Sequence, residues 1–143
     1  MIKIVIDTNV HVSAIAKPSS KPGKVVKLVV DGKVASVVSK KIIEEMRLTL
    51  TSKKLQKYLK TNENEIDRYV TSFQIMSEEV TGEGNEKQYS RDPDDDKFIY
   101  AALEGGAQYI VSGDEDLLVL ESVDNVQIKK AADFLDDVEV GAQ

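Results

Sequence analysis

Short apolar runs alternate along the chain with longer segments in which apolar residues recur every three or four positions. The short runs have the length and composition of buried strands, and they cover residues 2–6, 34–38, 109–111 and 126–128. The longer segments predict helices at residues 8–16, 22–30, 40–50, 55–59, 63–76, 93–103, 115–120 and 131–137. Alternation of strands and helices is typical of a parallel sheet covered by helices. We therefore expect an α/β fold in three layers, α/β/α, around a mainly parallel, twisted sheet of four or five strands.

Residues that commonly begin helices support several of these boundaries. Ser39 stands before the third helix as an N-cap, and Asn62 and Glu65 resemble a capping pair before the long fifth helix. Asp92, which a proline follows, marks another helix start. The polar, glycine-containing stretch 80–91 predicts a mobile loop beside the functional site.

The length of the chain, 143 residues, suits one domain with its own core. We expect a single domain at residues 1–138 and a disordered C-terminal tail at 139–143. No apolar run approaches the roughly 20 residues that span a bilayer, and the first strand begins without a basic leader. The expected protein is soluble and cytoplasmic, with no membrane partner.

Composition limits the chemistry to carboxylates. The chain has no cysteine, which excludes thiolate metal ligands, a cysteine nucleophile and disulfides. His11 is the single histidine, so catalysis by a pair of histidines is excluded as well.

The charge is divided unevenly along the chain. The formal net charge is -6, although residues 1–60 hold 13 lysines and arginines against four acids, a net charge of +9. A basic face of this kind could bind a phosphate backbone. Four lysines are candidate substrate-binding residues: Lys21, Lys24, Lys40 and Lys41. Alternatively, the lysines only solvate helices and pair with acids from the other half.

Two carboxylates directly follow predicted buried strands. Asp7 comes after the strand at 2–6, and Asp114 comes three residues after the strand at 109–111. Ligands bind outside the carboxyl ends of parallel strands, so the two side chains should lie close together. Asp7 could instead serve as an N-cap, and Asn9 could orient its carboxylate.

Other acids could reach the same edge of the sheet. The four acids between Asp92 and Asp96 repel one another, which favours a bound cation. Asp96 should lie nearest the buried face of the helix. Alternatively, these acids only stabilise the start of the helix, where negative charge is favourable. Glu45 is preferred to Glu44 because it adjoins the buried Met46.

The segment around Asp114 also has two interpretations. Ser112 and Glu115 match a capping box, and Asp116 is either a further ligand or a solvated acid in the first helical turn.

Hard oxygen ligands without histidine or cysteine select Mg²⁺ or Mn²⁺. Gathered carboxylates without a cation would repel one another by several kcal/mol at an effective dielectric of about 20. A bound divalent ion removes that conflict.

These residues resemble the PIN-domain nucleases, particularly those that are toxins of toxin-antitoxin pairs. Four motifs carry the resemblance, in this order: a strand with Asp7-Thr8-Asn9; Val37-Val38-Ser39 followed by Ile42-Ile43-Glu44-Glu45-Met46; Arg91-Asp92-Pro93-Asp94-Asp95-Asp96 followed by Phe98; and Val111-Ser112-Gly113-Asp114 followed by Asp116-Leu117-Leu118. The motifs span nearly the whole chain. Ser112 stands where threonine is common in the family.

The resemblance implies a set of site residues. Its acidic quartet is Asp7, Glu45, Asp96 and Asp114, with Asp7, Asp96 and Asp114 as metal ligands and Asn9, Ser112 and Asp116 in support. The run of three aspartates leaves Asp95 as the alternative third acid. The implied activity is Mg²⁺- or Mn²⁺-dependent hydrolysis of RNA by an endoribonuclease, with an antitoxin partner and a homodimer expected.

Two other functions fit the same residues. The domain could bind RNA or protein with its acids idle. An aspartate-based phosphotransfer enzyme also places an Asp after its first strand, but it has a second Asp two residues on, where this chain has Asn9.

Overall fold

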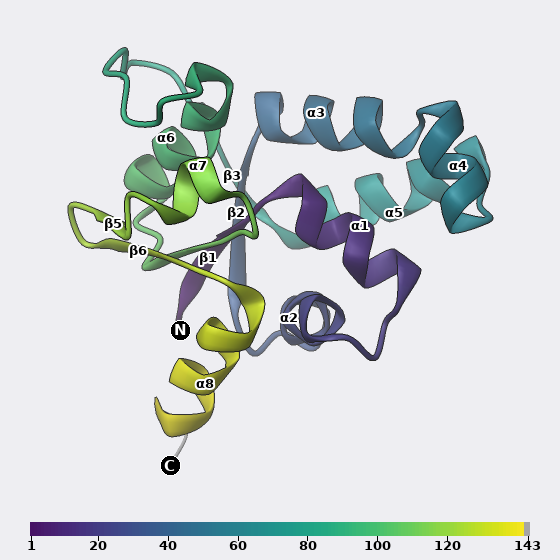
Figure 1. The fold of residues 1–143 in the computed structure, drawn as a ribbon, viewed down its shortest axis with the longest axis horizontal. Helices are drawn as coiled ribbons and strands as arrows, with labels where there is room; N and C mark the ends of the chain where they lie inside the picture. Colours follow the sequence, from purple (N-terminus) through teal and green to yellow (C-terminus); the bar gives the residue numbers. More distant parts are fainter. Residues whose placement is uncertain (142–143) are drawn as a thin grey trace.

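Six strands form one sheet in the computed structural model, which describes residues 1–141 (Figure 1). The strand order is β3-β2-β1-β4-β6-β5. The strands are β1 (Lys3–Ile6), β2 (Ala35–Ser39), β3 (Glu78–Val80), β4 (Tyr109–Val111), β5 (Ser122–Val123) and β6 (Val126–Lys129). All neighbouring pairs are parallel except β5 and β6.

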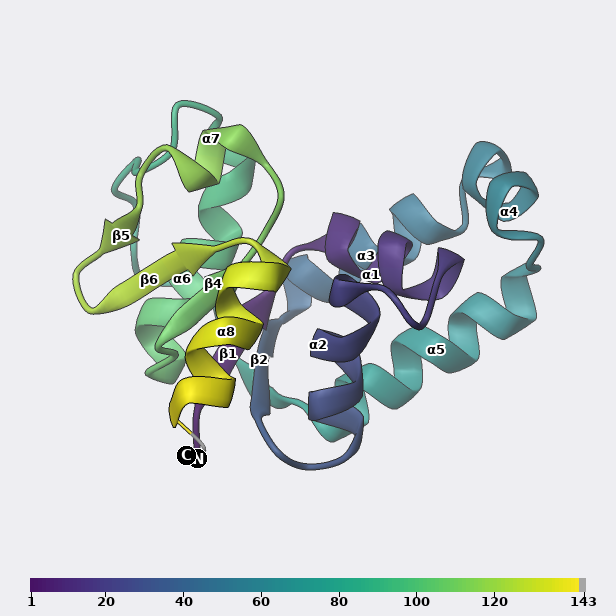
Figure 2. The ribbon, with the colours of Figure 1, turned by 60° about the horizontal axis from the view of Figure 1, so that its bottom comes forward.

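Helices cover both sides of this sheet. They are α1 (Thr8–Ala16), α2 (Lys21–Val30), α3 (Lys40–Leu50), α4 (Lys53–Leu59), α5 (Glu63–Met76), α6 (Asp96–Gly105), α7 (Glu115–Leu118) and α8 (Ala131–Gly141), with a 3-10 turn η1 (Pro93–Asp95) before α6. Helix α6 packs against the four strands β1 to β4, and Figure 2 shows α8 in front of the sheet with α6 behind it. The predicted three-layer α/β fold is confirmed.

The register of β1 with β4 sets the position of the site. Ile6 lies opposite Val111, and the backbone N–H of Asp7 donates to the Val111 carbonyl at 3.0 Å. Asp7 and Ser112, the residues that follow, therefore leave the sheet side by side at its carboxyl edge.

Close packing holds α6 against the strands. Ala101 and Ala102 are fully buried, and a Cβ added at Gly105 would come within 2.5 Å of a methyl group of Val37. Small residues on this face let the helix approach β2 closely. Helix α6 thereby fixes the position of the acids at its first turn.

The sheet has two strands more than the apolar runs predict, so the expected count of four or five was wrong. Strand β3 carries two exposed glutamates, and β5 has only two residues. Edge strands gain their hydrogen bonds from one neighbour and need no apolar pattern. The strand β3 also takes the first residue of the predicted loop at 80–91, and the mobility of that loop stays a prediction.

The C-terminal end also differs from the expectation. Helix α8 continues to Gly141 instead of ending near residue 137, so residues 139–141 are helical and not a disordered tail. The rest of the predicted tail, residues 142–143, lies outside the described residues.

Among the described residues, every helix is too short or too polar to cross a membrane.

Candidate functional site

Asp7 and Asp114 are joined through one buried serine. The Ser112 hydroxyl donates to Asp7 Oδ2 at 2.7 Å and accepts from the backbone N–H of Asp114 at 3.0 Å. Asp7 is 5% exposed and its side chain makes no capping hydrogen bond to α1. The carboxylate therefore does not serve as the helix cap that the sequence allowed.

The surroundings of Asp7 favour its neutral form. Burial raises the pKa of its carboxyl, and the nearby charges of Glu45 and Asp114 raise it further, while the Ser112 hydrogen bond opposes them. The charges of Glu45 and Asp114 act on Asp7 because both acids lie near it. Glu45 therefore approaches Asp7 from α3.

Glu45 is held by two side chains. Thr8 Oγ1 donates to Glu45 Oε2, and Lys97 Nζ lies 2.7 Å from Oε1. The neighbouring Glu44 is exposed. Lys97 also pairs with Asp94 at 3.2 Å, so one lysine bridges Glu45 and Asp94. Sequence reasoning missed Thr8 and Lys97, because their partner lies far along the chain.

Asp95 is a buried carboxyl with an unsatisfied oxygen. The residue is 8% exposed, and its Oδ2 is buried without a hydrogen-bond partner. Burial raises the pKa of Asp95 to about 7, and the charges of Asp114, Asp92, Asp7 and Asp116 contribute in that order. The carboxyl of Asp95 thus lies near the acid that follows β1 and the acids that follow β4.

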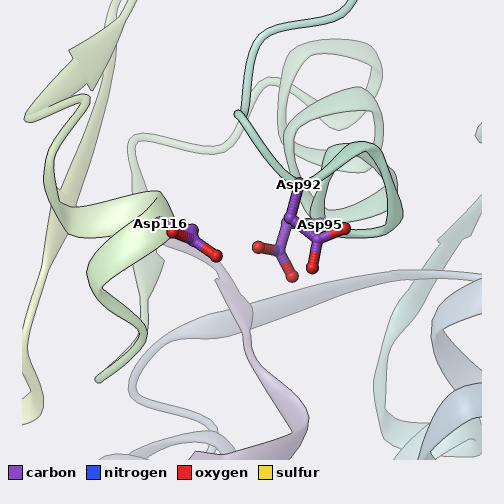
Figure 3. Close-up of side chains that lie close together, drawn as sticks. All are labelled: Asp92, Asp95 and Asp116. Atoms are coloured by element: carbon purple, nitrogen blue, oxygen red, sulfur yellow. The ribbon is translucent and has the colours of Figure 1, made fainter.

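Three of these acids are close enough to share an ion. One carboxylate oxygen each from Asp92, Asp95 and Asp116 lies within 4.8 Å of the others. Figure 3 shows Asp92 and Asp95 at the start of α6 and Asp116 on the facing α7, with their carboxyl groups in the space between the helices. From the sequence, Asp92 is a helix cap and a member of the acidic run, but not one of the predicted site residues.

Asp96, the predicted third acid, has a different role in the structure. It is 2% exposed, and its carboxylate accepts from the backbone N–H of Ser90 at 2.8 Å and of Tyr89 at 3.3 Å. These hydrogen bonds tie the Asp96 carboxylate to the loop at residues 89–90. Burial raises the pKa of Asp95, the alternative third acid, and the charges of Asp114 and Asp7 raise it further.

Asp114 and Asp116 follow each other into α7. Asp114 Oδ1 accepts from the Asp116 N–H at 2.9 Å, so Asp114 and not Ser112 caps this helix. The carboxylate of Asp116 forms an ion pair with Arg91 Nε. This exposed pair places a cation beside the acids, which the sequence did not reveal.

A cavity of about 820 Å³ adjoins the acids, and Asn9, Ser112 and Asp114 contribute to its wall. Of the four predicted substrate-binding lysines, Lys21 lines this cavity. Lys40 lines another cavity beside β3, whereas Lys24 and Lys41 line neither.

Comparison with known families identifies this arrangement. A family model described as PIN domain matches residues 3–116, which hold every acid described above. The chain belongs to the PIN domain family. PIN domains are generally nucleases and typically use divalent metals.

Two similar proteins extend this comparison of the PIN domain. The uncharacterized protein MJ1680 of Methanocaldococcus jannaschii is 38% identical over 134 residues, which cover 90% of this chain and 84% of that protein. The crystal structure of VapBC2 from Rickettsia felis bound to a DNA fragment from their promoter has a TM-score of 0.58 at 13% identity, covering 90% of this chain and 98% of that chain. At such identity the likeness shows the fold.

Proposed function

We propose that this PIN domain is a Mg²⁺- or Mn²⁺-dependent endoribonuclease that hydrolyses phosphodiester bonds in RNA. The observation that carries the proposal is the buried Asp95 carboxyl, whose free oxygen lies among other acids and whose pKa is raised to about 7. A group in this environment is stabilised when a cation replaces its proton. The donor set is entirely oxygen, which fits a hard divalent ion.

Asp7, Asp95 and Asp114 would hold the ion, with Asp92 and Asp116 beside them. When bound, such an ion activates water for attack and neutralises charge on the phosphodiester. The residues of the chain orient these groups. The Ser112 hydroxyl orients the Asp7 carboxylate by donating a hydrogen bond to it. The same hydroxyl accepts a hydrogen bond from the backbone N–H of Asp114.

Glu45 is a second carboxylate for the same reaction. Hydrogen bonds from Thr8 and Lys97 hold it in one orientation beside Asp7. In this orientation Glu45 would orient a water at the pocket or accept its proton. Asn9, on the wall of the adjacent cavity, supplies an uncharged hydrogen-bonding group for substrate.

We further propose that the chain is the toxin of a toxin-antitoxin pair, with an antitoxin protein as partner and a homodimer as its assembled form. The sequence motifs and the fold shared with VapBC2 of Rickettsia felis support this assignment. The test is co-purification with the product of any short gene directly beside this one.

The activity is tested with a mixed RNA pool in Mn²⁺, in chelator, and with the Asp7→Asn protein. We expect cleavage by the wild-type protein in Mn²⁺ alone. Asp7→Asn removes one buried acid without changing its size, so the variant should fold and fail to cleave. Contaminating nucleases would survive the substitution, and full activity of Asp7→Asn would refute the assignment.

A domain that binds RNA or protein without catalysis would behave differently. It would show no Mn²⁺ binding near millimolar concentration by calorimetry, and chelator would leave its RNA binding unchanged. Either result together with absent cleavage would favour that function over the ribonuclease.

A further inference from the structure

The cavity beside the acids is built from four separate segments. Residues of α1, the start of α2, the turn between β4 and α7, and the start of α8 form its wall. Its volume of about 820 Å³ lies in the range of roughly 300–1,000 Å³ that is usual for ligand pockets. Asp114 and Asp116 belong to this wall, so the cavity opens directly onto the proposed metal site.

Two lysines, Lys21 and Lys130, stand on this wall together with the acids Asp114, Glu115 and Asp116. Both lysines are exposed and take part in none of the salt bridges among residues 1–141. The neighbouring Lys129 differs, because its Nζ pairs with Asp137 at 2.6 Å. Lys21 and Lys130 are therefore available to a negatively charged ligand, whereas Lys129 is already neutralised.

The backbone adds to the same effect. Helices α2 and α8 pack against each other, and their first residues, Lys21 with Pro22 and Ala131 with Ala132, belong to the cavity wall. The N-terminus of a helix carries a partial positive charge that favours anions, although in α2 Pro22 has no N–H and the Gly23 N–H donates to Ser20 Oγ. The lysines and the helix starts thus attract the same kind of group.

The groove on the other side of Lys130 is more acidic than the cavity, although Lys129 and Lys130 also line it and Glu115 lines both. It has a volume of about 850 Å³ and contains the acids Glu115, Glu121, Asp133, Asp136 and Asp137. A polyanion is repelled from that groove and directed to the cavity that holds Lys21.

We propose that this cavity binds the RNA nucleotide next to the scissile phosphodiester, with Lys21 and Lys130 contacting its phosphate. The inference rests on the proposed ribonuclease function and adds the residues that position its substrate. Asn9 and Ser13 offer hydrogen bonds to the ribose or base, and Val10 and Pro22 offer apolar contact. The wall contains no aromatic ring, so the base is not held by stacking.

The test measures binding of a short fluorescent single-stranded RNA by anisotropy, in the uncleaving Asp7→Asn protein, across a series of salt concentrations. The variants are Lys21→Ala, Lys130→Ala and the double variant. Lys33→Ala is the matched control. Lys33 is an exposed lysine just before β2, at the amino ends of the strands, whereas the cavity lies at their carboxyl ends.

Each cavity lysine should account for one phosphate contact. We expect each single variant to bind RNA several-fold more weakly and to lower the slope of log K against log salt by about 0.7, the value for one contact on a single strand. The double variant should lose about twice that slope. Lys33→Ala should bind like the parent.

The proposal is overturned if Lys21→Ala and Lys130→Ala bind RNA as tightly as Lys33→Ala does, or if all three single lysine variants weaken binding equally. It is also overturned if the Asp7→Asn protein with all its lysines does not bind RNA at low salt. Failure of the ribonuclease function looks different. In that case the wild-type protein does not cleave RNA, although the pattern among the lysine variants persists.

Discussion

Asp95 and Asp96 are adjacent acids with opposite surroundings. Asp95 has a buried oxygen without a partner, while Asp96 accepts hydrogen bonds from two backbone N–H groups. Both are buried, so burial alone does not distinguish them. The hydrogen-bond partners do: Asp96 is bonded to the loop before α6, and Asp95 is the acid that we propose as the metal ligand.

Replacing each of these residues by alanine should therefore have opposite effects. In chelator, Asp96→Ala should lower the free energy of unfolding by about 1.5–3 kcal/mol, because it leaves N–H groups without a charged acceptor. Asp95→Ala should leave stability unchanged or raise it, while abolishing RNA cleavage. Urea denaturation measures the first effect, and equal destabilisation by both variants would contradict the assignment of Asp95 as the third acid.

At the scale of elements, α1 and α5 are joined by the single histidine. His11 on α1 is fully buried, its Nδ1 lies 2.8 Å from the Tyr69 hydroxyl, and its ring meets that of Phe73 edge to face at 4.4 Å. Its Nε2 has no partner. His11 thus belongs to the packing between two helices and not to the chemistry at the sheet edge.

Burial lowers the pKa of His11 to about 3 from an ordinary value of 6.5. Between these values the unfolded chain binds a proton that the folded chain does not, so stability falls as pH falls. The slope from this one group reaches about 1.4 kcal/mol per pH unit. His11→Phe removes this contribution, so the variant should lose less unfolding free energy than wild type as pH falls through this window.

Tyr69→Phe is the matched control for that measurement, because it removes the hydrogen bond and keeps the titrating ring. It should retain the steep acid dependence. The same slope in His11→Phe and wild type would show that His11 does not remain neutral in the fold.

At the scale of the whole molecule, the fold gathers acids from four segments at one edge of the sheet. Asp7 follows β1, Glu45 lies on α3, Asp92 and Asp95 precede α6, and the last acids begin α7. Without a cation their repulsion opposes folding. Burial raises the pKa values of Asp7 and Asp95, and the charges of the neighbouring acids raise them further.

A divalent ion should therefore stabilise the whole fold. Mn²⁺ or Mg²⁺ at a hundred times its dissociation constant should add about 2.7 kcal/mol to the free energy of unfolding, measured by thermal denaturation against a potassium salt of equal ionic strength. In chelator, the stability that protonated Asp95 contributes is complete below pH 3.8 and is lost as pH rises through about 7. The gain from the metal should accordingly be larger above pH 7 than below it.

Asp95→Ala should remove most of this gain. An equal rise in melting temperature in that variant and in wild type would place the ion elsewhere on the molecule.

The sequence by itself determined the fold class, the main strands and helices, and the sheet edge at which Asp7 and Asp114 meet. These features follow from local patterns: apolar runs form buried strands, and parallel strands end at a common edge. Four motifs along the chain carried the resemblance to PIN domains, and the position of Glu45 beside Met46 favoured it over Glu44. It missed β3 and β5, because edge strands carry no apolar pattern.

Only the tertiary structure decided which aspartate of the 92–96 run faces the other acids. A 3-10 turn precedes α6, and Gly105 of that helix approaches Val37 of β2 closely. The direction of a side chain depends on such contacts between distant segments. For the same reason the partners of Glu45 and the cavity between Lys21 and Lys130 exist only once residues far apart in the sequence are brought together.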